Sequence, residues 1–322
     1  MTLSQKNPSL PDLPQVFAIA LSGTNAITLS GEEKTKYLQG QVTCDVDAMA
    51  ENGVSFGAHC DAKGKMFSLF RLFNYKDKHL LLMPSAVAGA SLKELQKFGV
   101  FAKTDITLEQ ELGIFALAGE HAANWLTAAF GDIPNPQNQN ITFDDFNIVY
   151  VKGAIPRFVL VGRKDKLQKL FENADIPLYG QSVWHMLEIL DGVPVMSEPA
   201  ISKYVPQMLN VQAIGGISFT KGCYLGQETV ARMKYLGRNK KAMYTLATQS
   251  DQLVDIDDKL IKKVGENWRG AGDIINLYQA DNGDVYIQAV LANDTNEQTV
   301  LGLEKDKDAA VEVNPLPYSL ED

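Results

Sequence analysis

Five short β-prone runs follow one another at regular intervals near the end of the chain, and they constrain the fold more than any other feature. Turn residues separate these runs, which cover residues 243–247, 259–264, 270–278, 284–291 and 299–303. Short strands at such spacing, with turn signals between them, are typical of β-sandwiches and small barrels. We therefore predict a small β-barrel over residues 239–322.

The first 238 residues mix helical and strand-like segments, a pattern that favours an α+β fold. We expect strands at 53–59 and 66–73 joined by a turn at Asp61–Lys65, and helices at 85–98, 121–130, 165–173 and 182–190. Ser30 and Glu33 have the spacing of a capping box for a helix that ends near Leu38. A chain of 322 residues can bury more than one core, so we divide it into residues 1–238 and 239–322.

The most distinctive local motif is an octapeptide that places a cysteine between two glycines. Its residues are Lys221, Gly222, Cys223, Tyr224, Leu225, Gly226, Gln227 and Glu228. Glycine permits a tight turn around the sulfur, and a neighbouring lysine and a helix N-terminus both favour the reactive thiolate. We expect the motif to join a strand at 217–220 to a helix at 227–236, with Gln227 and Glu228 capping the loop. The structural alternative is a turn whose cysteine is only a small apolar residue.

A cationic segment follows this motif in a chain whose net charge is −9. No acidic residue occurs from Thr229 to Ser250, and this stretch contains five cations: Arg232, Lys234, Arg238, Lys240 and Lys241. One interpretation is an anion site beside the cysteine, and the other is an ordinary solvated basic face. The overall negative charge argues against direct binding of nucleic acid, which requires several cationic phosphate contacts.

The octapeptide, together with Val230-Ala231-Arg232, closely resembles the signature of the YgfZ family. Weaker similarities extend over most of the chain, at residues 37–43, 59–66, 265–269 and 315–320. The resemblance implies an α+β region of two intertwined subdomains, similar in fold to the aminomethyltransferase of the glycine cleavage system, followed by a β-barrel. It also implies binding of tetrahydrofolate or a one-carbon derivative. The implied role is support of iron–sulfur enzymes, such as the tRNA methylthiotransferase, and thereby of tRNA modification.

The resemblance assigns residues to the folate site and to the thiol. Trp184 is expected to stack on the flat pterin, although a place in the helix core is an alternative. The opposite side of the pocket falls near Thr24, where the lack of a second aromatic ring would weaken binding. The charge of the basic segment from Arg232 to Lys241 separately suggests that it holds an anion, either the glutamate tail of folate or an acidic surface of a partner, and Lys221 and Arg232 are assigned to the ligand on that ground. Cys223 is the functional thiol, with its role as ligand, persulfide carrier or redox group left open.

Two positions depart from the pattern of the aminomethyltransferases. Leu190 falls where those enzymes carry their pteridine-binding glutamate, with Glu188 and Asp191 nearby but out of register. The stretch Leu82–Ser85 contains no counterpart of their catalytic aspartate. A leucine cannot accept N–H donors, so we expect folate to bind more weakly or in another arrangement, and aminomethyl transfer to be lost. A folate-dependent one-carbon transferase and a non-catalytic scaffold remain the alternatives.

The cysteines and the apolar pattern suggest the cellular setting. Cys44, Cys60 and Cys223 are far apart and form no CxxC pair, so we expect neither disulfides nor a protein-only zinc site. His59 and Cys60 are neighbours in a strand and should therefore point to opposite faces, which disfavours a metal site there. Residues 1–14 lack a signal-like apolar core, and no run approaches the roughly 18 apolar residues of a spanning helix. These features predict a cytoplasmic protein without a membrane partner.

Overall fold

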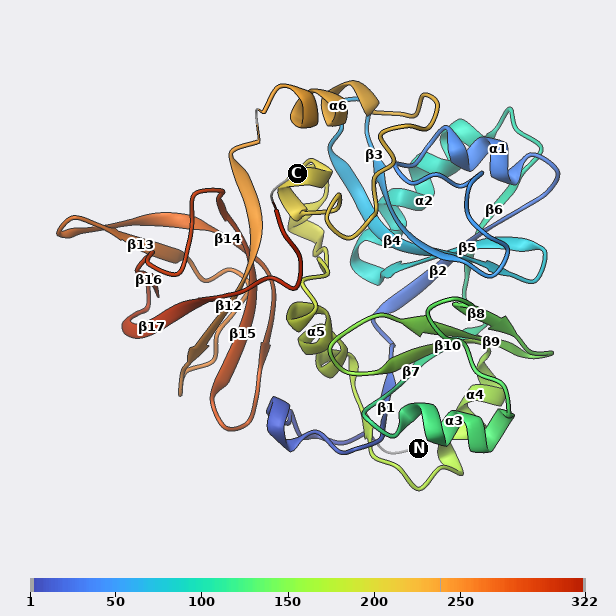
Figure 1. The fold of residues 1–322 in the computed structure, drawn as a ribbon, viewed down its shortest axis with the longest axis horizontal. Helices are drawn as coiled ribbons and strands as arrows, with labels where there is room; N and C mark the ends of the chain where they lie inside the picture. The colour runs from blue at the N-terminus through green and yellow to red at the C-terminus, as the bar shows by residue number, and fades with distance from the viewer. Residues whose placement is uncertain (1–2, 238, 321–322) are drawn as a thin grey trace.

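The computed structural model describes residues 3–237 and 239–320. Its first antiparallel sheet has five strands in the order β3-β4-β5-β2-β6 (Figure 1). Helices α1 and α2 pack beside it, and Leu38, Val87 and Leu95 of these helices join the core of the sheet. The elements are β2 (Thr24–Ser30), α1 (Lys34–Gln39), β3 (Val54–Cys60), β4 (Met66–Tyr75), β5 (Lys78–Pro84), α2 (Ser85–Gly99) and β6 (Asp105–Glu109).

A second sheet has six strands in the order β11-β1-β7-β10-β9-β8. The chain enters it at β1, crosses to the five-stranded sheet and returns at β7, so the two sheets are interleaved in sequence. Helices α3 and α4 cover one face, where Leu126 and Leu167 pack on Phe115 and Leu160. The elements are β1 (Phe17–Ala20), β7 (Leu112–Ala118), α3 (Ala122–Phe130), β8 (Asn140–Thr142), β9 (Phe146–Val151), β10 (Arg157–Arg163), α4 (Lys164–Glu172) and β11 (Leu178–Tyr179).

Helix α5 (Gln181–Leu190) lies at the centre of the molecule, between the two sheets and the barrel (Figure 1). Its buried residues Val183, Trp184 and Leu187 share one core cluster with Phe17 of β1 and Phe73 of β4. That cluster also includes Tyr278 from the barrel. Because α5 contacts all three parts, its side chains are held from several directions.

Residues 239–320 contain a closed barrel in the order β12-β15-β14-β13-β16-β17. Alternation along its strands explains how it docks. In β12, Tyr244 and Leu246 point into the barrel core, whereas Met243 packs into the core of the five-stranded sheet. The strands are β12 (Lys241–Gln249), β13 (Leu260–Val264), β14 (Asn267–Gln279), β15 (Asp284–Ala292), β16 (Leu301–Leu303) and β17 (Asp306–Asn314).

The α+β region with a C-terminal barrel confirms the predicted fold class, and the expected hairpin at β3–β4 is present. Two local predictions are wrong. The Ser30–Glu33 capping box does not form, because Ser30 ends β2 and Glu33 is itself the N-cap of α1, without a side-chain bond. Residues 217–220 form no strand. Turns and two short 3-10 helices, Glu198–Ala200 and Pro206–Leu209, instead fill much of the chain between α5 and α6 (Gln227–Tyr235). A third 3-10 helix, Leu10–Asp12, lies near the start of the chain.

Two buried histidines tie the five-stranded sheet to its helices and should make the fold sensitive to acid. His59 contacts Ser91 Oγ at 2.9 Å, and His79 bridges Thr35 Oγ1 and Asn74 Oδ1, both at 2.8 Å. Burial lowers the pKa of His59 to about 3 and that of His79 to about 4. The unfolded chain, with histidine pKa near 6.5, therefore binds more protons as the pH falls from 6.5 toward 4, and stability is lost across that window.

We expect the free energy of unfolding to fall by about 4 kcal/mol between pH 7 and pH 5, with roughly half of this from His79. Urea unfolding at both pH values measures it. His79→Gln should remove about half of the pH dependence, whereas the matched change His121→Gln, at an exposed position, should leave it intact. Equal pH dependence in the parent and in His79→Gln would contradict this assignment.

Candidate functional site

The cysteine motif lies on an irregular loop that is bonded along its length to the segment between α1 and β3. Ser218 N–H donates to the Thr43 carbonyl at 2.9 Å, and Thr43 Oγ1 donates to the Gly216 carbonyl at 2.6 Å. Further along, Leu225 N–H donates to the Gly40 carbonyl at 3.1 Å. These hydrogen bonds fix the path of the loop, although it belongs to no sheet.

Lys221 anchors this loop from inside. Its side chain is buried, and Nζ donates to three backbone carbonyls, those of Gln39, Val42 and Cys44, at 2.6, 2.9 and 2.7 Å. An ammonium group has three N–H donors, so all of them are used. Burial lowers the pKa of Lys221. In this structure the three donors of Lys221 point to the backbone, so the side chain acts as a tether of the loop, and the expected contact with a ligand anion or with the thiolate is not seen.

Gly226 marks the sharp turn into α6 and packs on the β3–β4 hairpin. Its φ of +84° favours glycine, and a Cβ there would lie 2.6 Å from the Asp61 carbonyl oxygen. Gly64 of the hairpin has φ of +73°, and a Cβ on it would lie 2.8 Å from Thr229 Cβ. Gly222, by contrast, faces open space and needs no glycine for steric reasons. The two turns thus interlock through Gly226 and Gly64.

The sulfur of this loop is accessible, unlike the other two. Cys223 is exposed, whereas Cys44 and Cys60 are buried, and all three are free thiols. Burial raises the pKa of Cys44 to about 11 and raises that of Cys60 further still. Since the thiolate is the nucleophile and the metal ligand, Cys223 is the cysteine that can react with a partner.

Helix α6 does not cap the loop in the expected way. Its N-cap is Gly226, without a side-chain capping bond, and Glu228 instead pairs with Arg232 at 2.5 Å on the exposed face. Lys234 Nζ lies 4.0 Å from the centroid of the Phe219 ring. Arg238 lies outside the described residues. The capping role assigned to Gln227 and Glu228 is therefore not seen, and Arg232 faces solvent with an acidic partner already in place.

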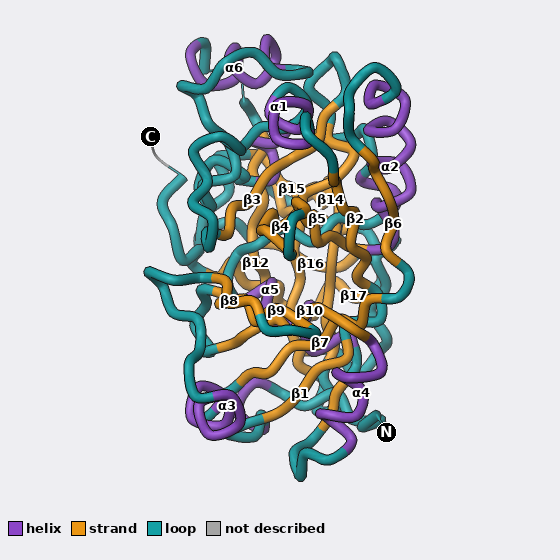
Figure 2. Tube along the Cα trace, turned by 90° about the vertical axis from the view of Figure 1, so that its right-hand side faces the viewer, coloured by secondary structure: helices purple, strands orange, loops and turns teal. Residues whose placement is uncertain are grey.

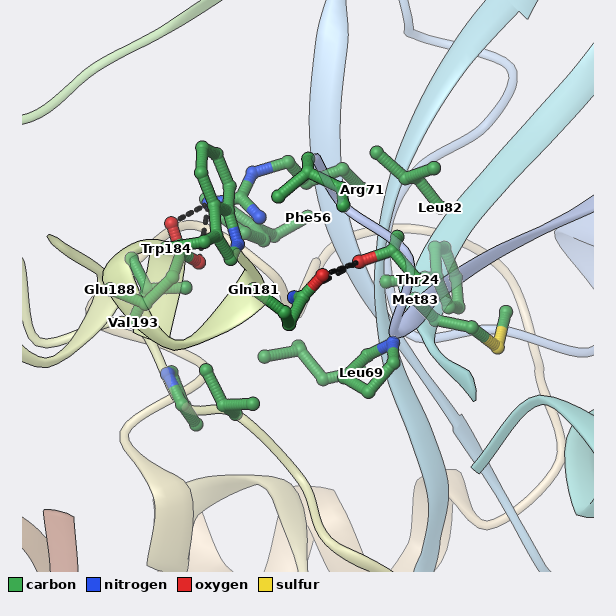
Figure 3. A pocket seen from close by; sticks show the side chains of 15 residues that line it. Thr24, Phe56, Leu69, Arg71, Leu82, Met83, Gln181, Trp184, Glu188 and Val193 are labelled. Atoms are coloured by element: carbon green, nitrogen blue, oxygen red, sulfur yellow. Dashed lines mark hydrogen bonds and ion pairs between the residues drawn. The ribbon is translucent and has the colours of Figure 1, made fainter. Parts of the chain in front are cut away.

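A separate pocket lies beside α5, where β2, β4 and β5 meet it (Figure 3). Both residues predicted for the folate site, Trp184 and Thr24, line it. Gln181 joins the two sides: Gly23 N–H donates to Gln181 Oε1 at 3.2 Å, and Thr24 Oγ1 lies 3.4 Å from the same oxygen. Lys221 and Arg232 do not line this pocket, and α6 lies at one end of the molecule, away from α5 (Figures 1 and 2). The four residues assigned to folate thus divide between two places.

Sequence reasoning missed Arg71 in this pocket and treated Glu188 only as a neighbour that was out of register. Arg71 on β4 and Glu188 on α5 both line it, and Arg71 Nη2 donates to Glu188 Oε1 and Oε2 at 2.8 and 2.7 Å. Behind them the fully buried Arg157 donates to Glu188 Oε1 at 2.6 Å and to Asp191 Oδ2. Arg71, Glu188 and Arg157 are each a lone charge in an apolar run, and this pattern could have drawn attention to them. The pairing of Arg71 with Glu188 could not be read from the sequence, because the two residues are 117 positions apart.

The pocket contains a carboxylate, but this carboxylate is not at position 190, where the comparison with the aminomethyltransferase pattern placed their pteridine-binding glutamate. Leu190 is only partly buried and packs on the cluster around α5. Glu188, two residues earlier, is 2 % exposed and forms part of the pocket wall. At the end of β5 the lining residues are Leu82, Met83 and Pro84. That side of the pocket is apolar, in keeping with the missing aspartate.

Comparisons with known proteins identify the family. The β-barrel domain of YgfZ matches residues 239–306. The tRNA-modifying protein YgfZ of Colwellia psychrerythraea is 49% identical over 99% of this chain and 98% of its own length. The chain belongs to the YgfZ family. A second YgfZ relative, the tRNA-modifying protein of Sodalis glossinidius, is 38% identical and is covered over 99% of both chains.

The aminomethyltransferase-like fold of this YgfZ chain is also found among solved structures. Aminomethyltransferase T of the glycine cleavage system from Bartonella henselae aligns with a TM-score of 0.72 over 95% of this chain and 87% of its own. Sequence identity is 15%, so the likeness shows the fold alone. Within the described residues, no group of three or more His, Cys, Asp or Glu could hold a metal ion, and no helix is long and apolar enough to cross a membrane.

Proposed function

We propose that this protein is a tetrahydrofolate-binding accessory factor for the assembly or repair of iron–sulfur enzymes, and that it thereby supports tRNA modification. The tRNA methylthiotransferase is the proposed client, and Cys223 is the functional thiol. The observation that carries the proposal is the placement of one exposed sulfur on a loop anchored by a buried lysine. Such a loop presents the thiol to a partner while fixing its position.

The names of the relatives support the tRNA part of this proposal. Both YgfZ proteins described above are tRNA-modifying proteins by name, and they match this chain over nearly its whole length. With a net charge of −9, we assign the protein an indirect role, through enzymes that act on tRNA, rather than binding of tRNA itself. Three free cysteines suit a reducing compartment, and we propose a cytoplasmic location.

Tetrahydrofolate or a one-carbon derivative is the proposed ligand of the α5 pocket. Trp184 offers an aromatic face for the pterin. The pterin ring carries adjacent N–H donors, and the Glu188 carboxylate can accept them. This assignment places the pteridine-binding acid on Glu188 instead of the position occupied by Leu190.

A folate-dependent one-carbon transferase is less well supported by the pocket. Aminomethyl transfer needs a carboxylate near the reacting carbon, and the end of β5 supplies Leu82, Met83 and Pro84 instead. Turnover of methylene- or formyl-tetrahydrofolate by this protein would nevertheless restore this alternative. A pure scaffold would gain support if neither folate nor Cys223 mattered.

Replacing Trp184 with leucine is expected to weaken tetrahydrofolate binding by about tenfold, because the aromatic face for the pterin is lost. Calorimetric titration measures the dissociation constant. Trp125→Leu is the matched control, since Trp125 of α3 stacks on Phe171 of α4 and does not line the pocket. Equal affinities for Trp184→Leu and the parent would remove Trp184 from the site.

A further inference from the structure

Arg71 fills the part of the α5 pocket that lies between two aromatic rings. Its guanidinium carbon is 4.8 Å from the centroid of Phe56 and 5.3 Å from that of Trp184. Figure 3 shows the side chain extending from β4 toward Trp184 and Glu188. The cavity that remains has a volume of about 40 Å³, which is room for about one water molecule. A planar ring can enter only if a side chain leaves.

The same guanidinium also forms hydrogen bonds with the carboxylate of Glu188. Arg71 Nη2 bonds both carboxylate oxygens. Arg157 bonds only Oε1, at 2.6 Å, and is additionally paired with Asp191. Loss of Arg71 would therefore free Oε2 while Arg157 still balances the charge of Glu188. The Oε2 atom of this buried carboxylate would then be able to accept new donors.

Arg71 resembles the proposed ligand chemically. A guanidinium is planar, stacks on aromatic rings and presents N–H donors to a carboxylate. The 2-amino-4-oxopyrimidine edge of a pterin is a cyclic acylguanidine, so it is also planar and presents two adjacent N–H donors. The side chain and the ligand thus compete for the same aromatic face and the same carboxylate.

We infer that Arg71 is an internal competitor that keeps the pocket closed and must swing out before a cyclic acylguanidine ring can bind. The inference rests on the proposed folate site and adds its regulation. A protein whose competent state is only partly populated binds with an affinity reduced by that fraction. Arg71 therefore lowers the affinity for folates, and it excludes flat rings that lack the donors needed to replace it on Glu188.

The test is titration of the parent, Arg71→Met and Arg71→Lys with 5-formyltetrahydrofolate. We expect Arg71→Met to bind about tenfold more tightly than the parent, because charged hydrogen bonds no longer have to be broken first, and Arg71→Lys to lie between them. Arg163→Met, at an exposed ion pair, should match the parent. If the parent binds and Arg71→Met binds equally or more weakly, the competitor role is overturned while the folate site survives. If neither binds, both proposals fall.

Two further measurements test the inference independently of the Arg71→Met variant. In Arg71→Ala, millimolar ethylguanidinium should occupy the space left by the Arg71 guanidinium and weaken folate binding, whereas ethylammonium should not. Equal effects of the two compounds on folate affinity would contradict the inference. In the unaltered protein, opening must precede binding, so the observed association rate should reach a plateau as folate concentration rises. If the observed association rate instead rose linearly with folate concentration and showed no plateau, Arg71 would not control entry to the pocket.

Discussion

Cys223→Ser is expected to abolish support of iron–sulfur enzymes while changing the free energy of unfolding by less than about 0.5 kcal/mol. The side chain is exposed, so the substitution leaves no cavity and buries no hydroxyl. A serine hydroxyl cannot replace a thiolate as a nucleophile or soft metal ligand. Urea unfolding of the purified protein and the activity of an iron–sulfur enzyme in complemented cells give the two readouts.

The buried cysteines provide the controls for this experiment. Cys44→Ala and Cys60→Ala remove a sulfur from the core of the five-stranded sheet, where both residues are at most 1 % exposed. We expect a loss of about 1 kcal/mol in stability but full support of the client enzymes. Alanine is preferred to serine at these positions because a buried hydroxyl without a partner carries its own penalty. A loss of function in Cys60→Ala equal to that in Cys223→Ser would undermine the special role of the exposed thiol.

Lys221→Met is expected to destabilise the protein by about 3 kcal/mol and to abolish function although Cys223 is unchanged. The substitution leaves the carbonyls of Gln39, Val42 and Cys44 without their shared donor, and unpaired buried acceptors each carry a desolvation cost. Without the tether the loop should also open locally. Chemical denaturation gives the stability, and the rate of proteolysis at residues 221–226 gives the local opening.

The neighbouring lysine on α6 is the matched control for the tether. Lys234 is exposed and lies over Phe219, so Lys234→Met should change stability by no more than about 0.5 kcal/mol. A Lys221→Met protein as stable and as resistant to protease as the parent would show that the three hydrogen bonds do not hold the loop. Retained function in an opened loop would show that positioning of the thiol is unimportant.

The sequence predicted the parts of the fold that are governed by local patterns. Alternation and turn residues indicated β12 to β16, and helical periodicity indicated α2 to α5. β17 was missed because Asp306–Asn314 has little apolar alternation, yet it closes the barrel by pairing with β12 and β16. Its strand character comes from its neighbours in space. The wrong strand at 217–220 has the converse cause, since these residues bond to the chain near Thr43 instead of to a sheet.

The site was predictable where residue type alone carries the chemistry. Glycine spacing indicated an accessible Cys223, which is exposed, and Trp184 and Thr24, which the family resemblance assigned to one pocket, line the same pocket. The target of Lys221 was not predictable, because backbone carbonyls leave no mark in the sequence. The Arg71–Glu188 pair also depends on packing between distant elements, here β4 and α5. Charge suggested that Lys221 and Arg232 bind the anionic part of the ligand, whereas neither residue lines the pocket that contains Trp184.

The most direct test of the central claim is the content of methylthiolated adenosine in tRNA. It would be measured by mass spectrometry in bacteria that lack their own relative and carry the parent, Cys223→Ser or Cys60→Ala at equal protein levels. The account predicts normal methylthiolation with the parent and with Cys60→Ala, and the level of the empty vector with Cys223→Ser. Normal methylthiolation in cells that carry Cys223→Ser would contradict the assignment of Cys223 as the functional thiol.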